Sequence, residues 1–403
     1  MRDRASRGYA HAMGSDQRFD AIVIGGGPAG AVTARGLARL GWHTALIERG
    51  PRYRSKACGH CLNSRATSLL QQAGLLNATS AIARGTVAHL RVHAANGESL
   101  KTPLQCDQLI TGGKVGNLIV PRSDFDQMLV DAAGHAGAVI MQNTAATVRV
   151  VDESDVHVHV RSNGALHTLR TPLVVGADGT GSAVARAASL AANARIGRCY
   201  GFSFDLACGD LEEHTNGAIA MHVARRGYLG LVSHGRGRLH CAALVSARAG
   251  SDSRDPLQFL QSMCRDHPSL RHASIGRIER NDMEDFVGTG PMPWRPRRIA
   301  NDRVALVGDA AGYIEPFTGE GMAWAIEAAL LLIDTLANAK PRQWNYLTAM
   351  NYQQRWRRAI SRRQLACRAV AFALARPWMV QGLLRAARRH PFFPQRAAQW
   401  MCL

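Results

Sequence analysis

The stretch that most constrains what this chain can fold into is a glycine-rich turn near its start. The apolar run Ala21–Ile24 leads directly into that turn, and residues 31–40 then have the pattern of a helix. The turn has the spacing G-x-G-x-x-G, with glycines at Gly25, Gly27 and Gly30. A strand, a tight turn and a helix in this order predict a site for the phosphates of a dinucleotide.

Each of the three glycines has its own expected role. Gly25 permits the tight turn, Gly27 lets the backbone approach a pyrophosphate, and Gly30 lets the helix pack closely on the strand. A second apolar run, Thr44–Ile47, then ends in Glu48. An acidic side chain at this offset accepts hydrogen bonds from a ribose hydroxyl. The stretch predicts a bound NAD or FAD and leaves the choice between them open.

Composition limits the class of protein. A chain of 403 residues with 46% apolar and 20% charged residues predicts two folded domains, one of them interrupted by the other. The 49 Lys and Arg against 30 Asp and Glu give a net charge of +19, which favours an anionic partner. Membrane surfaces, nucleic acids, acidic carrier proteins and phosphorylated substrates all meet that description.

Cysteine usage and the absence of long apolar runs bear on the compartment. The nine cysteines are scattered without the spacing of a disulfide framework, which indicates a reduced, cytoplasmic protein. Residues 1–18 are basic and polar, and we interpret them as a flexible leader rather than a secretion signal. No uninterrupted apolar run is long enough to span a bilayer. We therefore expect a cytoplasmic protein that at most lies on the inner membrane face.

A loop with two cysteines follows the first glycine turn. Cys58 and Cys61 have C-x-x-C spacing, so a dithiol there would be able to exchange electrons with a cofactor. The alternatives are that both thiols pack in the core, or that Cys58 lines a cofactor pocket without chemistry. Zinc is disfavoured, since His60 lies between the cysteines and no second ligand pair follows at zinc-site spacing. No metal site is predicted.

The middle of the chain alternates between two kinds of structure. Strands are expected at 87–93 and 105–112. The segment 120–126 is expected to open a helix that runs to about Gly134 and is capped by Ser123 or Asp124. Residues 139–175 have the pattern of a β-meander. Within it His157 and His159 alternate with valines, which is typical of a half-buried strand rather than of a metal pair. Strands over 198–208 and 218–245 predict a separate antiparallel sheet, followed by a helix at 256–266.

Two more glycine clusters follow buried strands. Asp178 and Gly179 stand where a strand stops and a helix begins, a turn that presents backbone N–H groups to phosphate. The third cluster runs from Gly308 to Gly321 and leads into a helix from Met322 that is apolar on nearly every side and must be buried. Its N-terminal dipole end would suit a ring that acquires negative charge.

Together the three clusters resemble the FAD-dependent oxidoreductases with the aromatic-hydroxylase (p-hydroxybenzoate hydroxylase) fold, in the geranylgeranyl-reductase-like branch. Arg122, Phe125 and Asp126 match the family's R-x-x-F-D element. Cys58 and Gly59 stand where reductases of this branch place a Cys-Gly pair close to the flavin. The resemblance covers Phe19 to Thr335 and implies FAD as the cofactor. It assigns to the FAD site Gly25, Gly27, Pro28, Ala29, Gly30, Glu48, Arg49, Arg122, Asp178, Gly179, Gly308, Asp309, Gly312, Pro316, Gly319, Gly321 and Met322.

The resemblance implies an α/β fold in which a Rossmann-like FAD-binding domain with a β-meander is interrupted by an antiparallel-sheet substrate domain. We assign 19–85, 113–190 and 285–336 to the first domain and 86–112 with 191–284 to the second. Residues 337–403 are expected to form a basic helical C-terminal region. That region has no acidic residue, and arginines and aromatic residues are interleaved along it.

The expected reaction is hydride transfer at a carbon–carbon double bond of an isoprenoid, polyketide or lipid-like substrate, free or carrier-bound. Candidate catalytic residues are Cys58 and Glu315 as proton donors and Tyr228 and Trp324 as pocket walls. A second glycine fingerprint for NAD(P)H is absent, so electrons are expected from transiently docked NAD(P)H or a reduced partner. This absence argues against a pyridine-nucleotide disulfide reductase.

Two other functions remain open. A monooxygenase of the same fold would hydroxylate an aromatic or polyketide-like substrate, although aromatic hydroxylases commonly carry a histidine where Gly312 stands. A docking protein that binds flavin for structural reasons alone would catalyse no reaction. The basic tail fits a helical cap, a membrane surface or an acidic carrier protein, whereas nucleic acid is disfavoured.

Overall fold

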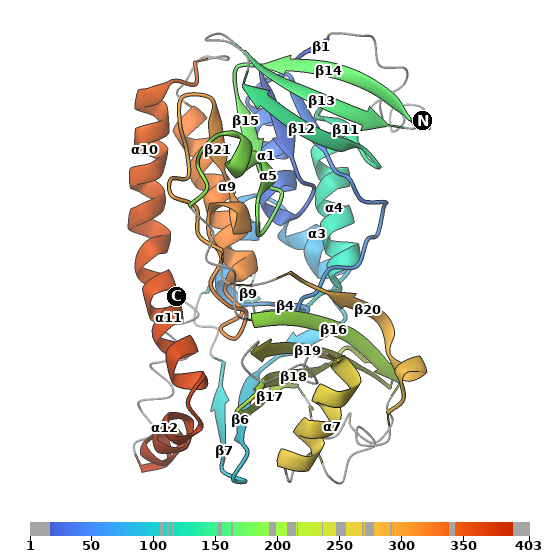
Figure 1. Cartoon of the computed structure of the whole chain (residues 1–403), viewed down its shortest axis with the longest axis vertical. Coiled ribbons are helices and arrows are strands. Elements are labelled where there is room, and N and C mark those ends of the chain that lie inside the picture. Colours follow the sequence, from blue (N-terminus) through green and yellow to red (C-terminus); the bar gives the residue numbers. More distant parts are fainter. Residues whose placement is uncertain are drawn as a thin grey trace.

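The protein is described here by a computed structural model in which two large sheets lie one above the other along the long axis (Figure 1). Described are residues 17–104, 109–110, 113–114, 116–150, 155–162, 164–192, 199–207, 215, 217–235, 237–246, 255–267, 270, 278–290, 292, 294–337 and 343–389. The predicted leader, except for its last two residues, and the last part of the basic tail lie outside these ranges.

The first sheet is parallel and forms the base of the dinucleotide site. Its strands run in the order β11 (Val139–Met141), β3 (Thr44–Ile47), β2 (Ala21–Ile24), β15 (Val174–Gly176) and β21 (Val304–Leu306). Helices α1 (Pro28–Arg39), α4 (Arg122–His135) and α9 (Gly321–Ala337) pack in this region, α1 against both others. Strands β3, β2, β15 and β21 are wholly buried, as expected when helices cover a parallel sheet.

The predicted β-meander is present, but it spans 145–171 instead of 139–175, because β11 and β15 pair within the parallel sheet. Strands β12 (Ala145–Val150), β13 (Val156–Ser162) and β14 (Ala165–Thr171) pair in antiparallel register, and β1 (Gln17–Arg18) adds to the edge. Along β13 the valines are buried whereas His157 and His159 are partly exposed. The alternation of a half-buried strand therefore accounts for the two histidines.

The second sheet is the predicted antiparallel one, with one parallel pair. Seven strands run in the order β20 (Glu284–Gly288), β16 (Cys199–Ala207), β19 (Arg238–Ser246), β18 (Gly227–Ser233), β17 (Ala218–Ala224), β6 (His89–Ala94) and β7 (Ser99–Pro103). Helix α7 (Pro256–Asp266) covers one face, where Phe259 and Met263 join an apolar cluster with Phe204. Because β20 belongs to this sheet, the sheet extends to Gly288, past the boundary that we expected at 284.

Two local expectations were wrong or incomplete. Helix α4 starts after Pro121 and no side chain caps it, so neither Ser123 nor Asp124 is the cap. The strand expected at 105–112 is represented by the short β8 (Leu109–Ile110), paired with β9 (Gly113–Lys114), and the rest of that range lies outside the described residues. The sheet instead gains β7 at Ser99–Pro103, which the sequence pattern missed because edge strands tolerate polar residues and a terminal proline.

A small three-stranded sheet joins the two halves. Strand β10 (Asn117–Ile119) pairs with β4 (Cys61–Leu62) and with β5 (Gly85–Val87). Helices α2 (Ser64–Gln72) and α3 (Leu76–Ala81) follow β4. The loop that carries Cys58 is thereby held between the parallel sheet and the seven-stranded sheet.

The described part of the C-terminal region is helical, as predicted. Helix α10 (Tyr346–Trp356) continues through a π-helical turn (Arg357–Ser361) into α11 (Arg362–Leu374), and α12 (Pro377–Arg389) follows. These helices run along one side of the molecule, past both large sheets (Figure 1). Helix α12 packs on β6 and β7. Among the described helices, none has both the length and the apolar character needed to cross a bilayer.

Candidate functional site

The first glycine turn has the geometry that its spacing predicts. Gly25 has a φ of +112°, and a Cβ atom there would lie 2.2 Å from the carbonyl oxygen of Ala177. A Cβ atom on Gly30 would lie 1.8 Å from the carbonyl oxygen of Gly25. At Gly27, in contrast, the nearest atom to a Cβ would be Nζ of Lys56, 3.6 Å away. Two glycines therefore close the turn, while the third faces a lysine.

The turn is ready to receive an anion. Helix α1 begins at Pro28. The residue before it, Gly27, supplies no side-chain cap. An uncapped N-terminus with a positive dipole end, beside a lysine, suits a phosphate group. Ala29, next in the helix, is buried and touches Gly308, where a Cβ would lie 2.8 Å from the Cβ of Ala29. The first and third glycine clusters therefore meet.

Glu48 lies directly after β3, as expected, and its carboxylate accepts hydrogen bonds from two backbone amides of the site. Its Oε2 accepts a hydrogen bond from the Gly26 amide at 2.7 Å, and its Oε1 accepts one from the Gly50 amide at 2.8 Å. A carboxylate has further lone pairs with which to accept from a ribose hydroxyl. The neighbouring Arg49 is exposed.

A buried cluster of opposite charges lies beside this turn. The Arg122 guanidinium donates two hydrogen bonds to Asp126, each 3.1 Å long, and Lys56 lies 2.9 Å from the same carboxylate. Burial disfavours the charged form of Arg122, but the Asp126 carboxylate outweighs it, so the pKa of Arg122 is raised. Arg122 also has a side-chain hydrogen bond with Cys58. The predicted R-x-x-F-D element and the predicted Cys58 loop are therefore in contact.

Asp309 faces the same positive charges from the third cluster. Burial raises the pKa of its carboxyl group to about 6, although Arg122 and Lys56 oppose the shift. A carboxyl group in this setting is suited to hydrogen-bond a hydroxylated chain. Residues from all three expected segments, 48–58, 122–126 and 308–309, thus converge at one place.

Asp178 has a different local role from the one expected. Its carboxylate accepts hydrogen bonds from the Ser182 hydroxyl and the Ala183 amide at the start of the short helix α5 (Ala183–Ala187), whose N-cap is Ser182. The preceding Ala177 lies against Gly25, so the turn itself adjoins the first glycine cluster. Gly179 has a φ of +83° with open space around it. The carboxylate is directed into its own helix, while the backbone of the turn lies at the predicted site.

The loop 313–317 is partly buried and packs against the seven-stranded sheet. The Tyr228 ring packs edge-on against Phe317, with ring centroids 5.2 Å apart. Burial raises the pKa of Glu315 to about 8, against the weaker effect of the Phe317 backbone amide. Burial, followed by the Glu315 charge, also raises the pKa of Tyr228. Glu315 therefore keeps its proton at neutral pH.

The structure does not bring all four candidate catalytic residues together. Tyr228, Tyr313 and Phe317 share one apolar cluster. Trp324, although buried, belongs to the core of the parallel sheet and not to that cluster. That Trp324 lines a substrate pocket stays a prediction. Cys58 and Cys61 are not joined in a disulfide bond.

Side chains of helix α11 form hydrogen bonds with the loop that begins at Gly312, and the sequence did not predict these contacts. Glu320 is 2% exposed and accepts hydrogen bonds from Arg363 at 2.7 Å and Asn63 at 3.2 Å. Burial raises the pKa of Glu320 to about 7, with Arg363 opposing. Gln364 donates to the Gly312 carbonyl at 3.3 Å. One sequence signal pointed to this contact. Glu320 is an acidic residue directly before an apolar helix, and the charged residues of the C-terminal region are all basic.

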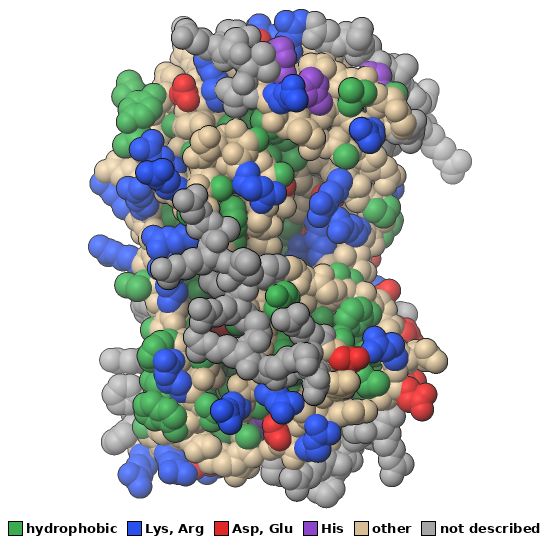
Figure 2. Space-filling view, in the orientation of Figure 1, with side chains coloured by type: hydrophobic (Ala, Val, Ile, Leu, Met, Phe, Trp, Pro, Cys, Tyr) green, Lys and Arg blue, Asp and Glu red, His purple; other side chains and the backbone are tan. Residues whose placement is uncertain are grey.

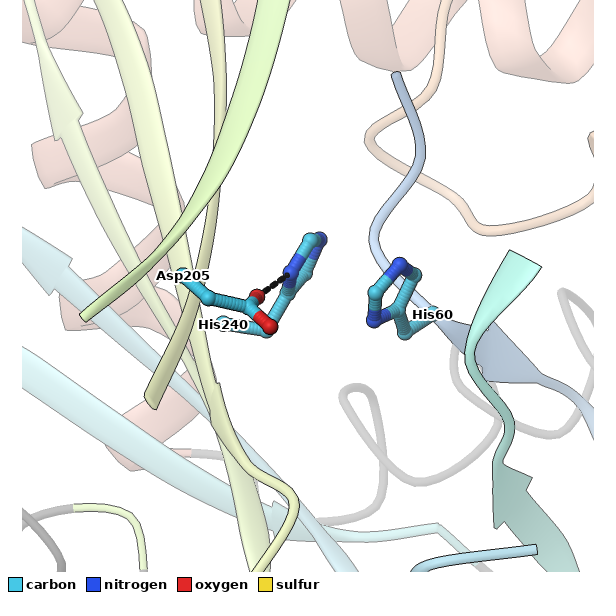
Figure 3. A group of neighbouring side chains, drawn as sticks. All are labelled: His60, Asp205 and His240. Carbon is cyan, nitrogen blue, oxygen red and sulfur yellow. Dashed lines mark hydrogen bonds and ion pairs between the residues drawn. The ribbon is translucent and has the colours of Figure 1, made fainter. Parts of the chain in front are cut away.

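A group of histidines beside Cys58 was also missed. His240 lies opposite Asp205 across β16 and β19, and its Nδ1 is 2.5 Å from an Asp205 oxygen. The His60 ring, from the Cys58 loop, stacks on His240 (Figure 3). His234 lies 3.2 Å from the second Asp205 oxygen. These residues are far apart in the chain and meet only through strand register, so no local pattern could reveal them.

Comparison with known proteins agrees with this geometry. The family model described as an FAD binding domain matches residues 18–346. The chain belongs to this family. FAD-binding oxidoreductases of the p-hydroxybenzoate hydroxylase type are thus its relatives, and the protein is an FAD-dependent oxidoreductase, as its sequence indicates.

Individual relatives refine the likeness. The chain is 27% identical over 349 residues to digeranylgeranylglycerophospholipid reductase 2 of Methanothermobacter thermautotrophicus, covering 86% of this chain and 85% of that protein. A geranylgeranyl bacteriochlorophyll reductase-like structure from Thermoplasma acidophilum superposes with a TM-score of 0.75 at 23% identity, over 90% of this chain and 88% of that one. The anhydrotetracycline hydroxylase OxyS of Streptomyces rimosus gives 0.72 at 19%, over 96% and 76%. Both structures share the fold.

The residues present fit FAD. A Cβ atom would fill the turn at Gly25 and Gly30, the uncapped start of α1 is suited to the pyrophosphate, and Glu48 to the ribose. Asp309 and Arg122 would hold the rest of the cofactor. When bound, FAD supplies the capacity to accept and give a hydride. Gly319, Gly321, Pro316 and Met322 remain predicted contacts.

Proposed function

We propose that this FAD-dependent oxidoreductase reduces carbon–carbon double bonds of an isoprenoid or lipid-like substrate. The observation that carries the proposal is the likeness to a digeranylgeranylglycerophospholipid reductase along 86% of the chain. Hydroxylases share the fold at lower identity. Gly312, which stands where aromatic hydroxylases commonly carry a histidine, also favours the reductase.

The chain supplies an apolar wall for such a substrate. Tyr228, Leu244, Met221 and Met292 of the seven-stranded sheet region cluster with Phe317. An isoprenoid chain presents only apolar surface, so burial against such a wall would favour binding by about 25 cal/mol for each square ångström removed from water. We infer that the substrate lies between this sheet and the loop 313–317.

Reduction of a double bond needs a proton as well as a hydride. Glu315 keeps its proton at neutral pH because burial raises its pKa to about 8, and its neighbours in this wall are Tyr228 and Phe317. A neutral carboxylic acid held beside an apolar wall is a suitable general acid. We propose Glu315 as the proton donor, and Cys58 as a lining residue beside Arg122.

The oxygen dependence of the reaction tests this function. Protein loaded with FAD is given NADPH or, in a second arm, dithionite, together with a geranylgeranylated lipid. Equal product yield with and without oxygen is expected for the reductase. Product that forms only with oxygen, in proportion to the oxygen consumed, would establish the monooxygenase instead. The NADPH arm also shows whether that donor suffices.

We further propose that the C-terminal helices dock on an anionic bilayer that contains the substrate. Large apolar side chains stand exposed on them, among them Leu347 at 76% and Trp378 at 70%. Basic and apolar side chains alternate along the edge of the molecule formed by these helices (Figure 2). In α12, Val380 and Leu384 pack inward while Trp378 and Leu383 face outward. Such surfaces bind membrane interfaces, and each basic residue near the lipid contributes about 1 kcal/mol.

Vesicle sedimentation tests the docking surface. We expect binding to vesicles of phosphatidylglycerol and little binding to phosphatidylcholine, with release by high salt. Trp378→Ser should weaken binding, whereas Leu166→Ser, an equally exposed apolar residue on the β-meander, should not. Equal loss in both variants, or retention by an acidic protein but by neither vesicle, would overturn the membrane proposal.

A further inference from the structure

His240 and Asp205 form a buried polar pair on the seven-stranded sheet. The two residues are register partners on β19 and β16, and each is less than a tenth exposed. Their strand neighbours Phe204 and Cys241 belong to the apolar cluster beneath α7. Because side chains alternate along a strand, the pair lies on the opposite face, toward the Cys58 loop.

Both ring nitrogens of His240 are engaged. Nδ1 is 2.5 Å from Oδ1 of Asp205, and Nε2 is 2.6 Å from the carbonyl oxygen of Cys58. Hydrogen bonds with His234 and His240 outweigh burial and hold the pKa of Asp205 below its usual range, so its carboxylate is ionised. A carboxylate and a backbone carbonyl only accept hydrogen bonds. Each ring nitrogen therefore faces an acceptor, and the His240 ring is held between Asp205 and the Cys58 loop.

The Cys58 loop is shaped to receive this donor. His60 adopts a φ of +55°, and its ring lies flat on His240, with centroids 3.5 Å apart and planes 15° apart. Burial, followed by the His240 charge, lowers the pKa of His60 well below its usual value, so the stacked ring is neutral. The His60 carbonyl in turn accepts a hydrogen bond from Val120 at 2.7 Å. The loop is thus held on both sides.

Cys58 interacts through both its backbone and its side chain. Its carbonyl oxygen accepts from His240, and its side chain has a hydrogen bond with Arg122, beside Asp126. We propose that the Asp205–His240 pair is a clamp that positions Cys58 against Arg122. His240 and Asp205 are positioning residues for the flavin site, outside the residues that the family resemblance assigns. That Cys58 lines the reaction site rests on the proposed function.

A metal ion is the competing explanation of the same atoms. One ligand atom each from His60, Asp205 and His240 lie within 4.8 Å of one another. However, both His240 nitrogens are already hydrogen-bonded, and stacked rings direct their lone pairs along parallel planes rather than to a common point (Figure 3). The clamp therefore explains the arrangement better than a metal centre.

Hydrogen exchange of the FAD-loaded protein tests the clamp without any need for turnover. In His240→Leu, the amides of the peptide 57–62 should exchange at least about ten times faster, since the buried hydrogen bond to the Cys58 carbonyl is lost. Asp205→Asn, which keeps the side-chain shape, should show a smaller increase. His222→Leu is the matched control, because His222 is also a histidine of this sheet and is equally buried, at 3% exposed.

Three results would overturn the clamp. One is unchanged exchange of the 57–62 peptide in both His240→Leu and Asp205→Asn; a second is one zinc ion per chain in purified protein, lost in the same variants. An equal increase in His222→Leu would also contradict it, because it would indicate general loosening of the sheet.

Turnover separates the clamp from the proposed function. Cys58→Ala and His240→Leu should each lower kcat for the lipid with KM nearly unchanged, and the double variant should be no slower than Cys58→Ala alone. Additive losses would contradict a role exerted through Cys58. If unaltered protein reduces no lipid, the proposed function fails, while the exchange measurement still decides the clamp.

Discussion

Glu315 should make the stability of the protein depend on pH. Its folded pKa is about 8, raised by burial from 4.5. The folded chain therefore holds a proton that the unfolded chain releases once the pH exceeds 4.5. This contribution to stability is complete below pH 4.5 and is lost as the pH rises through about 8. Replacement by glutamine keeps the shape but removes the titration.

The size of the effect follows from the two pKa values. The difference between 4.5 and about 8 corresponds to about 5 kcal/mol over the full range. Between about pH 5.5 and about pH 8.5 the free energy of unfolding of the unaltered protein should fall by about 3 kcal/mol from this group alone. In Glu315→Gln that part of the fall should be absent.

Urea unfolding followed by tryptophan fluorescence at the two pH values measures the difference. Glu284→Gln serves as the control, because Glu284 is exposed and should leave the pH dependence as it is. If Glu315→Gln falls with pH as steeply as the unaltered protein, the carboxyl group is ionised when folded. Both the burial argument and the proposed proton donor would then be wrong.

Two further changes have definite expected results. Gly30→Ala should lower the FAD content of purified protein at least about tenfold, because the new Cβ would lie 1.8 Å from the Gly25 carbonyl oxygen. The control Gly382→Ala, with open space around the new Cβ, should leave the FAD content unchanged. Equal FAD content in both variants would refute the packing role of Gly30. Arg363→Met should lower the free energy of unfolding by about 3–5 kcal/mol at alkaline pH, because buried Glu320 loses its charged partner. The loss should shrink below pH 7, the approximate pKa of Glu320, and a loss that does not depend on pH would contradict this.

The fold could largely be predicted because its signals are local. The strand Ala21–Ile24, the glycine turn and the strand Thr44–Ile47 follow one another closely in the chain, and Gly25 and Gly30 are required by contacts within that unit or with Ala177. Likewise, the alternation along β13 was sufficient to predict a half-buried strand. Local patterns of this kind depend on neighbours in the chain.

The site was predicted only in part, because much of it depends on long-range contacts. The meeting of Cys58 with Arg122 is consistent with the family resemblance, but the placement of His240 depends on its register with Asp205 and on a loop 182 residues away. Trp324 shows the same limit, since a buried apolar helix does not reveal which apolar cluster its tryptophan joins.

The mass of the lipid product tests the central claim most directly. FAD-loaded protein, reduced by dithionite without oxygen, is incubated with a geranylgeranylated glycerophospholipid, and the lipid is analysed by mass spectrometry. The account predicts a lipid that has gained two hydrogen atoms for each double bond reduced, with less product from Glu315→Gln. Unchanged lipid without oxygen, together with a product that has gained an oxygen atom in air, would contradict it.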